Sequence, residues 1–139
     1  SWAEQAGAAP HERARAHLSA SRAKGEVGAW NTAAYHAVRA AEYAAAEQAD
    51  PELLRDALRA LLKTSERGMM TSQAIAIVRR ASESEDPETL RLYADLCRRH
   101  EKWQEAARAL ERLAAMELPD DVRLAVSNEL AEALDRLDS

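Results

Sequence analysis

Phenylalanine is absent from this sequence of 139 residues, and glycine and proline occur only four times each. No apolar run approaches the length of a membrane span, and no secretory signal peptide is visible, so we expect no membrane insertion. The single cysteine, Cys97, excludes an internal disulfide and fits a reducing compartment, which favours a cytoplasmic protein. Aromatic and β-branched residues are sparse, whereas alanine, glutamate, arginine and leucine dominate. The composition therefore predicts an all-α protein.

The net charge of −5 is distributed unevenly along the chain. Residues 1–116 carry 17 basic and 17 acidic side chains, whereas residues 117–139 carry seven acids against two arginines. Because no basic excess accompanies the arginines, we expect no nucleic-acid partner. The whole imbalance lies in residues 117–139, which contain the last predicted helix.

A short pattern recurs at the start of three predicted helices. Each copy has a proline, an acid directly after it, an aliphatic residue three positions on and an arginine four positions on. The copies begin at Pro51, Pro87 and Pro119, at intervals of 36 and 32 residues. Self-similarity at a period of about 20–50 residues is typical of stacked repeat architectures.

Apolar spacing, capping residues and helix-breaking glycines predict seven helices. Because the connecting loops are short, successive helices should pair as antiparallel hairpins. We expect one domain over residues 11–139, preceded by an N-terminal tail, 1–10, in which Trp2 is either a docking anchor or disordered. The predicted helices cover about 11–24, 27–48, 51–66, 72–83, 87–100, 102–117 and 119–138, which gives hairpins 11–48, 51–83 and 87–117 and a closing helix.

The unit that begins at Pro87 resembles the tetratricopeptide repeat (TPR). Ala94 and Ala106 match the small residues that let the two helices of a repeat approach each other. The unit that begins at Pro51 needs four extra residues, about one helical turn, to match the same pattern. Residues on the family's signature positions, four in each helix, are Leu90, Tyr93, Ala94, Cys97, Trp103, Ala106, Leu110 and Leu113.

This resemblance implies a short right-handed α-solenoid of stacked hairpins. Its concave face, lined by the first helix of each hairpin, would bind a peptide or a partner segment. The family's asparagine-containing carboxylate clamp is not reproduced, because Arg59 and Asp95 occupy its positions. The partner-binding residues that the resemblance implies are Arg55, Arg59, Lys63, Arg91, Asp95, Arg98, Arg99 and Arg123.

Arg55, Arg91 and Arg123 occupy equivalent positions in the three units, so stacking would align them in one groove. Guanidinium groups bind carboxylates through two parallel hydrogen bonds, which predicts a preference for an acidic segment or a chain-terminal carboxylate. In the alternative interpretation, each arginine forms a solvated ion pair with a neighbouring acid such as Asp56 or Asp95.

The acidic last helix also has two interpretations. It could cap the solenoid with a polar outer face, as terminal repeats do, or it could fill the groove of a neighbouring copy. The leading hypothesis for the whole chain is a protein-interaction scaffold for a protein or peptide partner. The alternatives are a self-association domain that forms a homo-oligomer, and the helical sensor part of a larger regulatory protein, consistent with a start at Ser1 rather than Met.

The residues that carry catalytic or metal chemistry do not form a recognisable pattern. His11, His17, His36 and His100 are not spaced as a metal-binding pair, and Cys97 falls on an inward helix position. No glycine-rich phosphate loop and no nucleophile elbow occur. We therefore expect no catalytic residue, no metal, no cofactor and no enzymatic activity. Aromatic residues at helical spacing are expected in the core: Trp30, Tyr35, Tyr43, Tyr93 and Trp103.

Overall fold

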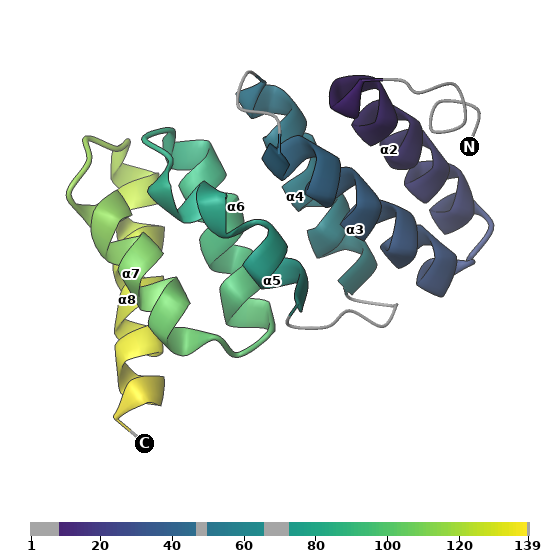
Figure 1. Ribbon diagram of the computed structural model, residues 1–139. Helices are drawn as coiled ribbons and strands as arrows, with labels where there is room; N and C mark the ends of the chain where they lie inside the picture. Colours follow the sequence, from purple (N-terminus) through teal and green to yellow (C-terminus); the bar gives the residue numbers. More distant parts are fainter. Residues whose placement is uncertain (1–8, 47–49, 66–72, 139) are drawn as a thin grey trace. The chain divides into compact units, whose positions relative to one another are not determined.

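The computed structural model of the chain is helical and describes residues 9–46, 50–65 and 73–138 (Figure 1). These ranges contain seven α-helices and one 3₁₀ turn, and no strand lies within them. The prediction of an all-α protein is therefore confirmed. Trp2 lies outside the described residues. None of the helices in the described ranges combines the length and the apolar character needed to cross a membrane.

The chain divides into two compact units, residues 1–80 and 81–139. In each unit the first two helices pack against each other. The arrangement of the hairpins as one right-handed solenoid, and as one domain over residues 11–139, stays a prediction.

The first unit is built around a helix rich in alanine. Its helices are α2 (Pro10–Glu26), α3 (Trp30–Ala46), α4 (Pro51–Ser65) and α5 (Gln73–Ile77). α2 contacts both α3 and α4, and α3 contacts α4 and α5 (Figure 1). Small side chains let helices approach closely, and α3 buries only alanines: Ala33, Ala34, Ala37, Ala40, Ala41 and Ala44.

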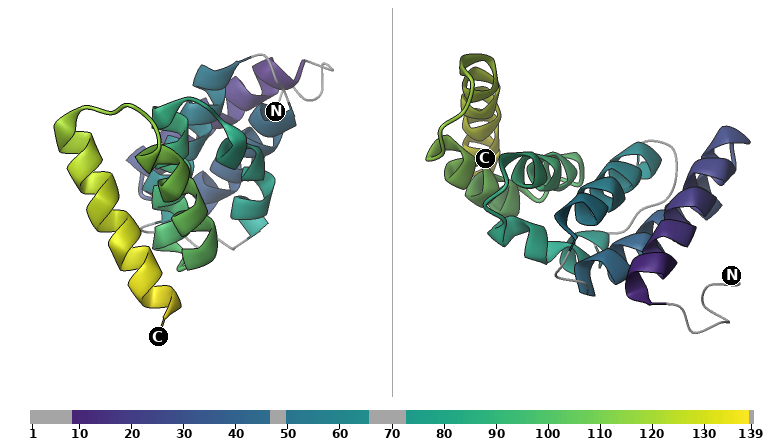
Figure 2. Two further views of the ribbon diagram at one scale, coloured as in Figure 1. Left: turned by 90° about the vertical axis from the view of Figure 1, so that its left-hand side faces the viewer. Right: turned by 90° about the horizontal axis from the view of Figure 1, so that it is seen from above.

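The second unit repeats this scheme with α6 (Pro87–Arg99), α7 (Trp103–Ala114) and α8 (Asp120–Leu137). α7 packs against α6 on one side and α8 on the other (Figure 2). Ala94 on α6 and Ala106 on α7 are completely buried. Larger side chains fill the remaining space, and the buried ones include Leu90, Tyr93, Leu96, Leu110, Leu113 and Val126.

Aspartate–proline pairs fix the starts of α4 and α6. Asp50 Oδ1 accepts a hydrogen bond from the Leu53 backbone N–H at 3.1 Å. Asp86 Oδ2 accepts bonds from the backbone N–H and the hydroxyl of Thr89, at 3.2 and 2.7 Å. The proline that follows each aspartate needs no hydrogen-bond partner in the first turn. The predicted starts at residues 51 and 87 are confirmed.

The predicted helix over residues 72–83 is not continuous. It divides into α5 and a 3₁₀ turn at Arg79–Glu83. Arg80 Nη1 donates to the carbonyl of Ala45 at 2.8 Å, and Arg112 donates to the carbonyl of Ser82. Arg80 thus ties the turn to α3, and Arg112 also donates to the carbonyls of Glu83 and Ser84. Because Arg112 binds these carbonyls from α7, they are satisfied without a regular α-helix.

Two further expectations in the first unit need correction. α3 begins at Trp30 rather than near residue 27, because Gly28 adopts a φ of 77° and turns the chain between α2 and α3. The prediction that Tyr35 lies in the core is wrong, since its side chain is 57% exposed. Tyr35 stands on the side of α3 opposite the buried alanines. Tyr93 is buried as expected, whereas Trp30, Tyr43 and Trp103 are half-buried.

Leu110 tests how much the α6–α7–α8 core stabilises the chain. Its side chain is completely buried, so Leu110→Ala should lower the free energy of unfolding by about 2–5 kcal/mol in chemical denaturation. Leu124→Ala is the matched control, because Leu124 is 64% exposed on α8 and its truncation should change stability by less than about 0.5 kcal/mol. Equal losses in the two variants would contradict this core.

Candidate functional site

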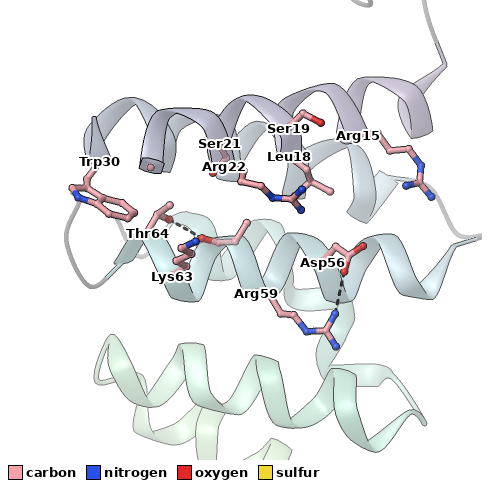
Figure 3. Close-up of a pocket in the computed structure, with 12 residues that line it drawn as sticks. Arg15, Leu18, Ser19, Ser21, Arg22, Trp30, Asp56, Arg59, Lys63 and Thr64 are labelled. Atoms are coloured by element: carbon pink, nitrogen blue, oxygen red, sulfur yellow. Dashed lines mark hydrogen bonds and ion pairs between the residues drawn. The ribbon is translucent and has the colours of Figure 1, made fainter. Parts of the chain in front are cut away.

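A groove of about 480 Å³ runs between α2 and α4 in the first unit. Its volume lies within the range of about 300–1,000 Å³ that is common for ligand sites. Arg22 and Leu18 extend from α2 toward α4, and Trp30 lies at one end (Figure 3). We call this site the α2/α4 groove; its charged and large apolar lining residues are Arg15, Leu18, Arg22, Trp30, Asp56, Arg59 and Lys63.

The α2/α4 groove carries an excess of positive charge. Four cationic side chains line it, against the single carboxylate of Asp56. That carboxylate accepts a hydrogen bond from Arg59 Nη1 at 3.0 Å (Figure 3). Arg22 and Lys63 form no hydrogen bond or ion pair with any residue of the described ranges. A cleft lined by one sign of charge concentrates its electric field and attracts the opposite charge.

Glycine at position 25 lets Trp30 approach the end of α2. A Cβ atom at Gly25 would lie 3.1 Å from the Trp30 ring, which is tighter than ordinary van der Waals contact. The indole therefore packs against the end of α2 while it still lines the groove. Together with Leu18, it adds an apolar surface to an otherwise cationic site.

Two contacts with α3 hold the α2 wall of the groove in place. His17 Nδ1 and His36 Nδ1 share a hydrogen bond at 2.9 Å, and His17 is buried. The Ser21 hydroxyl donates to the carbonyl of Ala33 at 2.9 Å. Both contacts join α2 to α3, so the residues on the opposite side of α2 face the groove from a fixed helix.

The second unit has a corresponding groove between its first and third helices. This α6/α8 groove has a volume of about 470 Å³ and is lined by Asp95, Arg98, Arg99, Trp103, Glu129 and Glu132. Arg91 Nη2 lies 3.2 Å from Glu129 Oε2, and Arg98 Nη2 lies 2.6 Å from Glu132 Oε1. The α8 glutamates therefore neutralise arginines of α6 across this groove.

The pKa values of two carboxyl groups in this groove are shifted in opposite directions. The hydrogen bond from Arg98 lowers the pKa of Glu132 below its ordinary value of 4.5. Burial raises the pKa of Asp95, and the nearby Glu129 carboxylate adds to this effect. Arg98 also lies 3.6 Å from Asp95, so one guanidinium group links acids of both helices.

The structure distributes the predicted partner-binding residues between these two grooves. Arg59 and Lys63 line the α2/α4 groove. Asp95, Arg98 and Arg99 line the α6/α8 groove, and Arg91 is paired with Glu129 beside it.

The remaining two predicted residues lie outside both grooves. Arg123 donates to the carbonyl of Leu118 at 3.3 Å, and Arg55 is half-buried on α4. Arg55 belongs to the first unit, whereas Arg91 and Arg123 belong to the second. The aligned arrangement of these three arginines stays a prediction.

Sequence reasoning missed the α2 side of the first groove. Arg15, Leu18 and Arg22 stand on one helix face at intervals of three and four residues. On the predicted first helix, this spacing indicates that the three side chains lie on one face, which could have been recognised as the wall of a groove. Trp30 was predicted to lie in the core. Its position in the groove depends on the close approach of its ring to Gly25, and the periodicity of apolar residues does not reveal such a contact.

Neither groove is arranged for metal or thiol chemistry. Within the part of the chain that the structure describes, no three His, Cys, Asp or Glu side chains are grouped to hold a metal ion. Burial raises the pKa of the Cys97 thiol to about 12, and a buried thiol of this kind is inert as a nucleophile.

Comparison with known proteins gives no relative: no family model, no curated protein and no solved structure matches the chain. Function is therefore inferred from the geometry and charge of the two grooves.

The Arg98–Glu132 pair makes the stability of the second unit depend on pH. Because the pKa of Glu132 is lowered in the folded state, its contribution is present above its unfolded value of 4.5 and is lost as the pH falls through the folded value. Glu132→Gln should lower the unfolding free energy near pH 7 by less than about 1 kcal/mol, since Glu132 is 42% exposed and screened by solvent.

The same variant should also lose part of the decrease in stability that the parent shows between about pH 6 and pH 3. Chemical denaturation across this pH range measures both effects. Glu117→Gln, on an exposed residue outside both grooves, should reproduce the parent curve. Superimposable curves for Glu132→Gln and the parent would show that the pair does not stabilise the fold.

Proposed function

We propose that the chain is a protein-interaction module that binds an acidic peptide segment in the α2/α4 groove. The observation that carries this proposal is the ratio of four cationic side chains to one carboxylate around the groove. Arg22 and Lys63 stand on opposite walls, and both are exposed to solvent. An acidic segment between the walls would face a cation from each helix.

The contrast with the α6/α8 groove supports this proposal. There, the third helix contributes Glu129 and Glu132, which bind Arg91 and Arg98 of the first helix. In the α2/α4 groove, the third helix contributes Arg59 and Lys63 with only one carboxylate, that of Asp56, which binds Arg59. Arg15 Nη2 of α2 lies 3.8 Å from Asp50 Oδ2. The α6/α8 groove is thus neutralised from within its unit, whereas Arg22 and Lys63 of the α2/α4 groove would receive carboxylates from a partner.

The side chains of the α2/α4 groove suit a carboxylate-rich ligand that also has an apolar residue. Guanidinium groups bind carboxylates through forked hydrogen bonds, and Lys63 adds a compact charge that can follow a mobile ligand. Trp30 and Leu18 provide apolar surface for a neighbouring side chain. Because the cations are exposed, most of the attraction should be long-range and sensitive to salt.

We also propose that the hairpins belong to a TPR-like solenoid, with the groove on its concave face. Contacts among α2, α3 and α4 support this arrangement within the first unit, because the first and third helices meet beside a shared second helix. Burial of Ala94 and Ala106 supports it within the second unit. A closed bundle of all the helices in a determined structure would contradict it.

Binding of a fluorescent hexaglutamate peptide, followed by anisotropy at low salt, tests the groove. Arg22→Glu should weaken binding by about tenfold or more, because it replaces an attractive charge with a repulsive one. Lys24→Glu is the matched control: it makes the same charge change on the same helix, but Lys24 does not line the groove. Its affinity should stay within about twofold of the parent.

A hexalysine peptide should not bind, and added salt should release hexaglutamate. Equal weakening by Arg22→Glu and Lys24→Glu would show that net charge, rather than the groove, attracts the peptide. No binding by the parent at about millimolar peptide would also overturn the proposal.

A further inference from the structure

α8 presents a continuous acidic stripe to solvent. Six exposed residues follow one another at alternating intervals of three and four, so they lie along one face of the helix. The stripe contains three aspartates and Leu124, which is 64% exposed. We call this face the α8 stripe; its residues are Asp121, Leu124, Asn128, Ala131, Asp135 and Asp138.

The inner face of α8 is occupied by its own unit. Val126 and Ala133 are buried, and Glu129 and Glu132 bind the arginines of α6. Arg136 lies over the Trp103 ring at 5.3 Å and joins the last turn of α8 to α7. α8 is therefore anchored from one side, and the residues of the α8 stripe are exposed to solvent.

The α8 stripe matches the α2/α4 groove in charge and in apolar content. The groove offers four cations with Leu18 and Trp30, and the stripe offers three aspartates with Leu124. Acidic residues are also concentrated at the end of the sequence, where residues 117–139 contain seven acids and only two arginines. Opposite charges on two surfaces of one protein favour association between copies.

The α6/α8 groove already shows an acidic helix bound beside an arginine-bearing helix. Two α8 carboxylates, three residues apart, reach Arg91 and Arg98 on α6. An acidic helix lying along the α2/α4 groove would use the same pairing of carboxylate and guanidinium groups.

Resting on the acidic-segment function proposed above, we propose that the occupant of the α2/α4 groove is a second copy of this chain, which docks through its α8 stripe. The two surfaces differ, so the contact is heterologous: each copy offers one groove and one stripe. Such contacts continue from copy to copy and form either rings or open chains.

The mass of the protein in solution, measured by sedimentation at increasing concentration, tests this contact. At low salt the mass should rise from the 15.3 kDa monomer to that of dimers and larger species. At about 0.5 M salt it should return to the monomer, because screening removes attraction between exposed charges. A parent protein that stays monomeric at every concentration would overturn the proposal.

Two charge-reversed variants identify the surfaces. The groove variant combines Arg22→Glu with Lys63→Glu, and the stripe variant combines Asp121→Lys with Asp138→Lys. Each variant alone should be monomeric, because its groove and its stripe then carry the same sign of charge. Mixed together they should associate again, since each groove now finds a stripe of opposite charge. Failure of the mixture to associate would overturn the proposal.

A charge-matched control separates this contact from a general charge effect. Glu111→Lys with Glu117→Lys makes the same change on exposed residues outside the stripe, and this protein should associate like the parent. Association that survives in the groove variant but not in the stripe variant would show that α8 binds a different surface, which also overturns the proposal. Circular dichroism checks that all variants keep their helices.

Hexaglutamate binding, measured on the same samples, separates this proposal from the function on which it rests. The stripe variant has an intact groove and should bind hexaglutamate while remaining monomeric. A parent that binds hexaglutamate but never exceeds the monomer mass would overturn the second-copy proposal and leave the acidic-segment function standing. A parent that does neither would overturn both.

Discussion

Close helix packing through alanine is the constraint on which both units depend. α3 buries six alanines and no larger side chain, and Ala106, Ala107 and Ala109 are buried on α7. Small side chains on the middle helix bring its two neighbours near enough for their long side chains to share a groove. The middle helix thus sets the geometry, whereas the first and third helices set the chemistry of each groove.

The charge of the third helix then decides what each groove can do. Glu129 and Glu132 on α8 bind the arginines of α6, so the α6/α8 groove is neutralised from within. Arg59 and Lys63 on α4 leave the α2/α4 groove cationic. Two grooves of similar volume therefore differ in charge, and the difference follows from a few side chains on one helix in each unit.

The sequence predicted the helices well where local signals agreed. At Asp50 and Asp86, the capping aspartate, the following proline and the apolar spacing all indicate a helix start, and the structure confirms both. The prediction of one helix over residues 72–83 failed because two contacts distant in sequence hold part of it as a turn: Arg80, within the turn, donates to Ala45 on α3, and Arg112 of α7 donates to Ser82. Periodicity within a segment cannot report such contacts.

The candidate site was predicted only in part, for a related reason. Arg59 and Lys63 were predicted because the resemblance to the TPR implies a binding face on the helix that begins at Pro51, whereas α2 begins at Pro10 without the aspartate that marks α4 and α6. No sequence motif therefore indicated that the cations of α2 and one face of Trp30 line a groove. Pairing of Arg91 and Arg98 with α8 likewise depends on a contact between helices separated by more than 30 residues.

Solvent exposure of the cations in the α2/α4 groove determines how it can recognise a ligand. Like charges on facing walls repel only slightly in water, so the unit can keep them without a bound anion. For the same reason each cation contributes little alone, and specificity must come from several weak contacts made together. A rigid acidic helix suits this requirement better than a flexible acidic tail, because its carboxylates are already ordered and less conformational entropy is lost on binding.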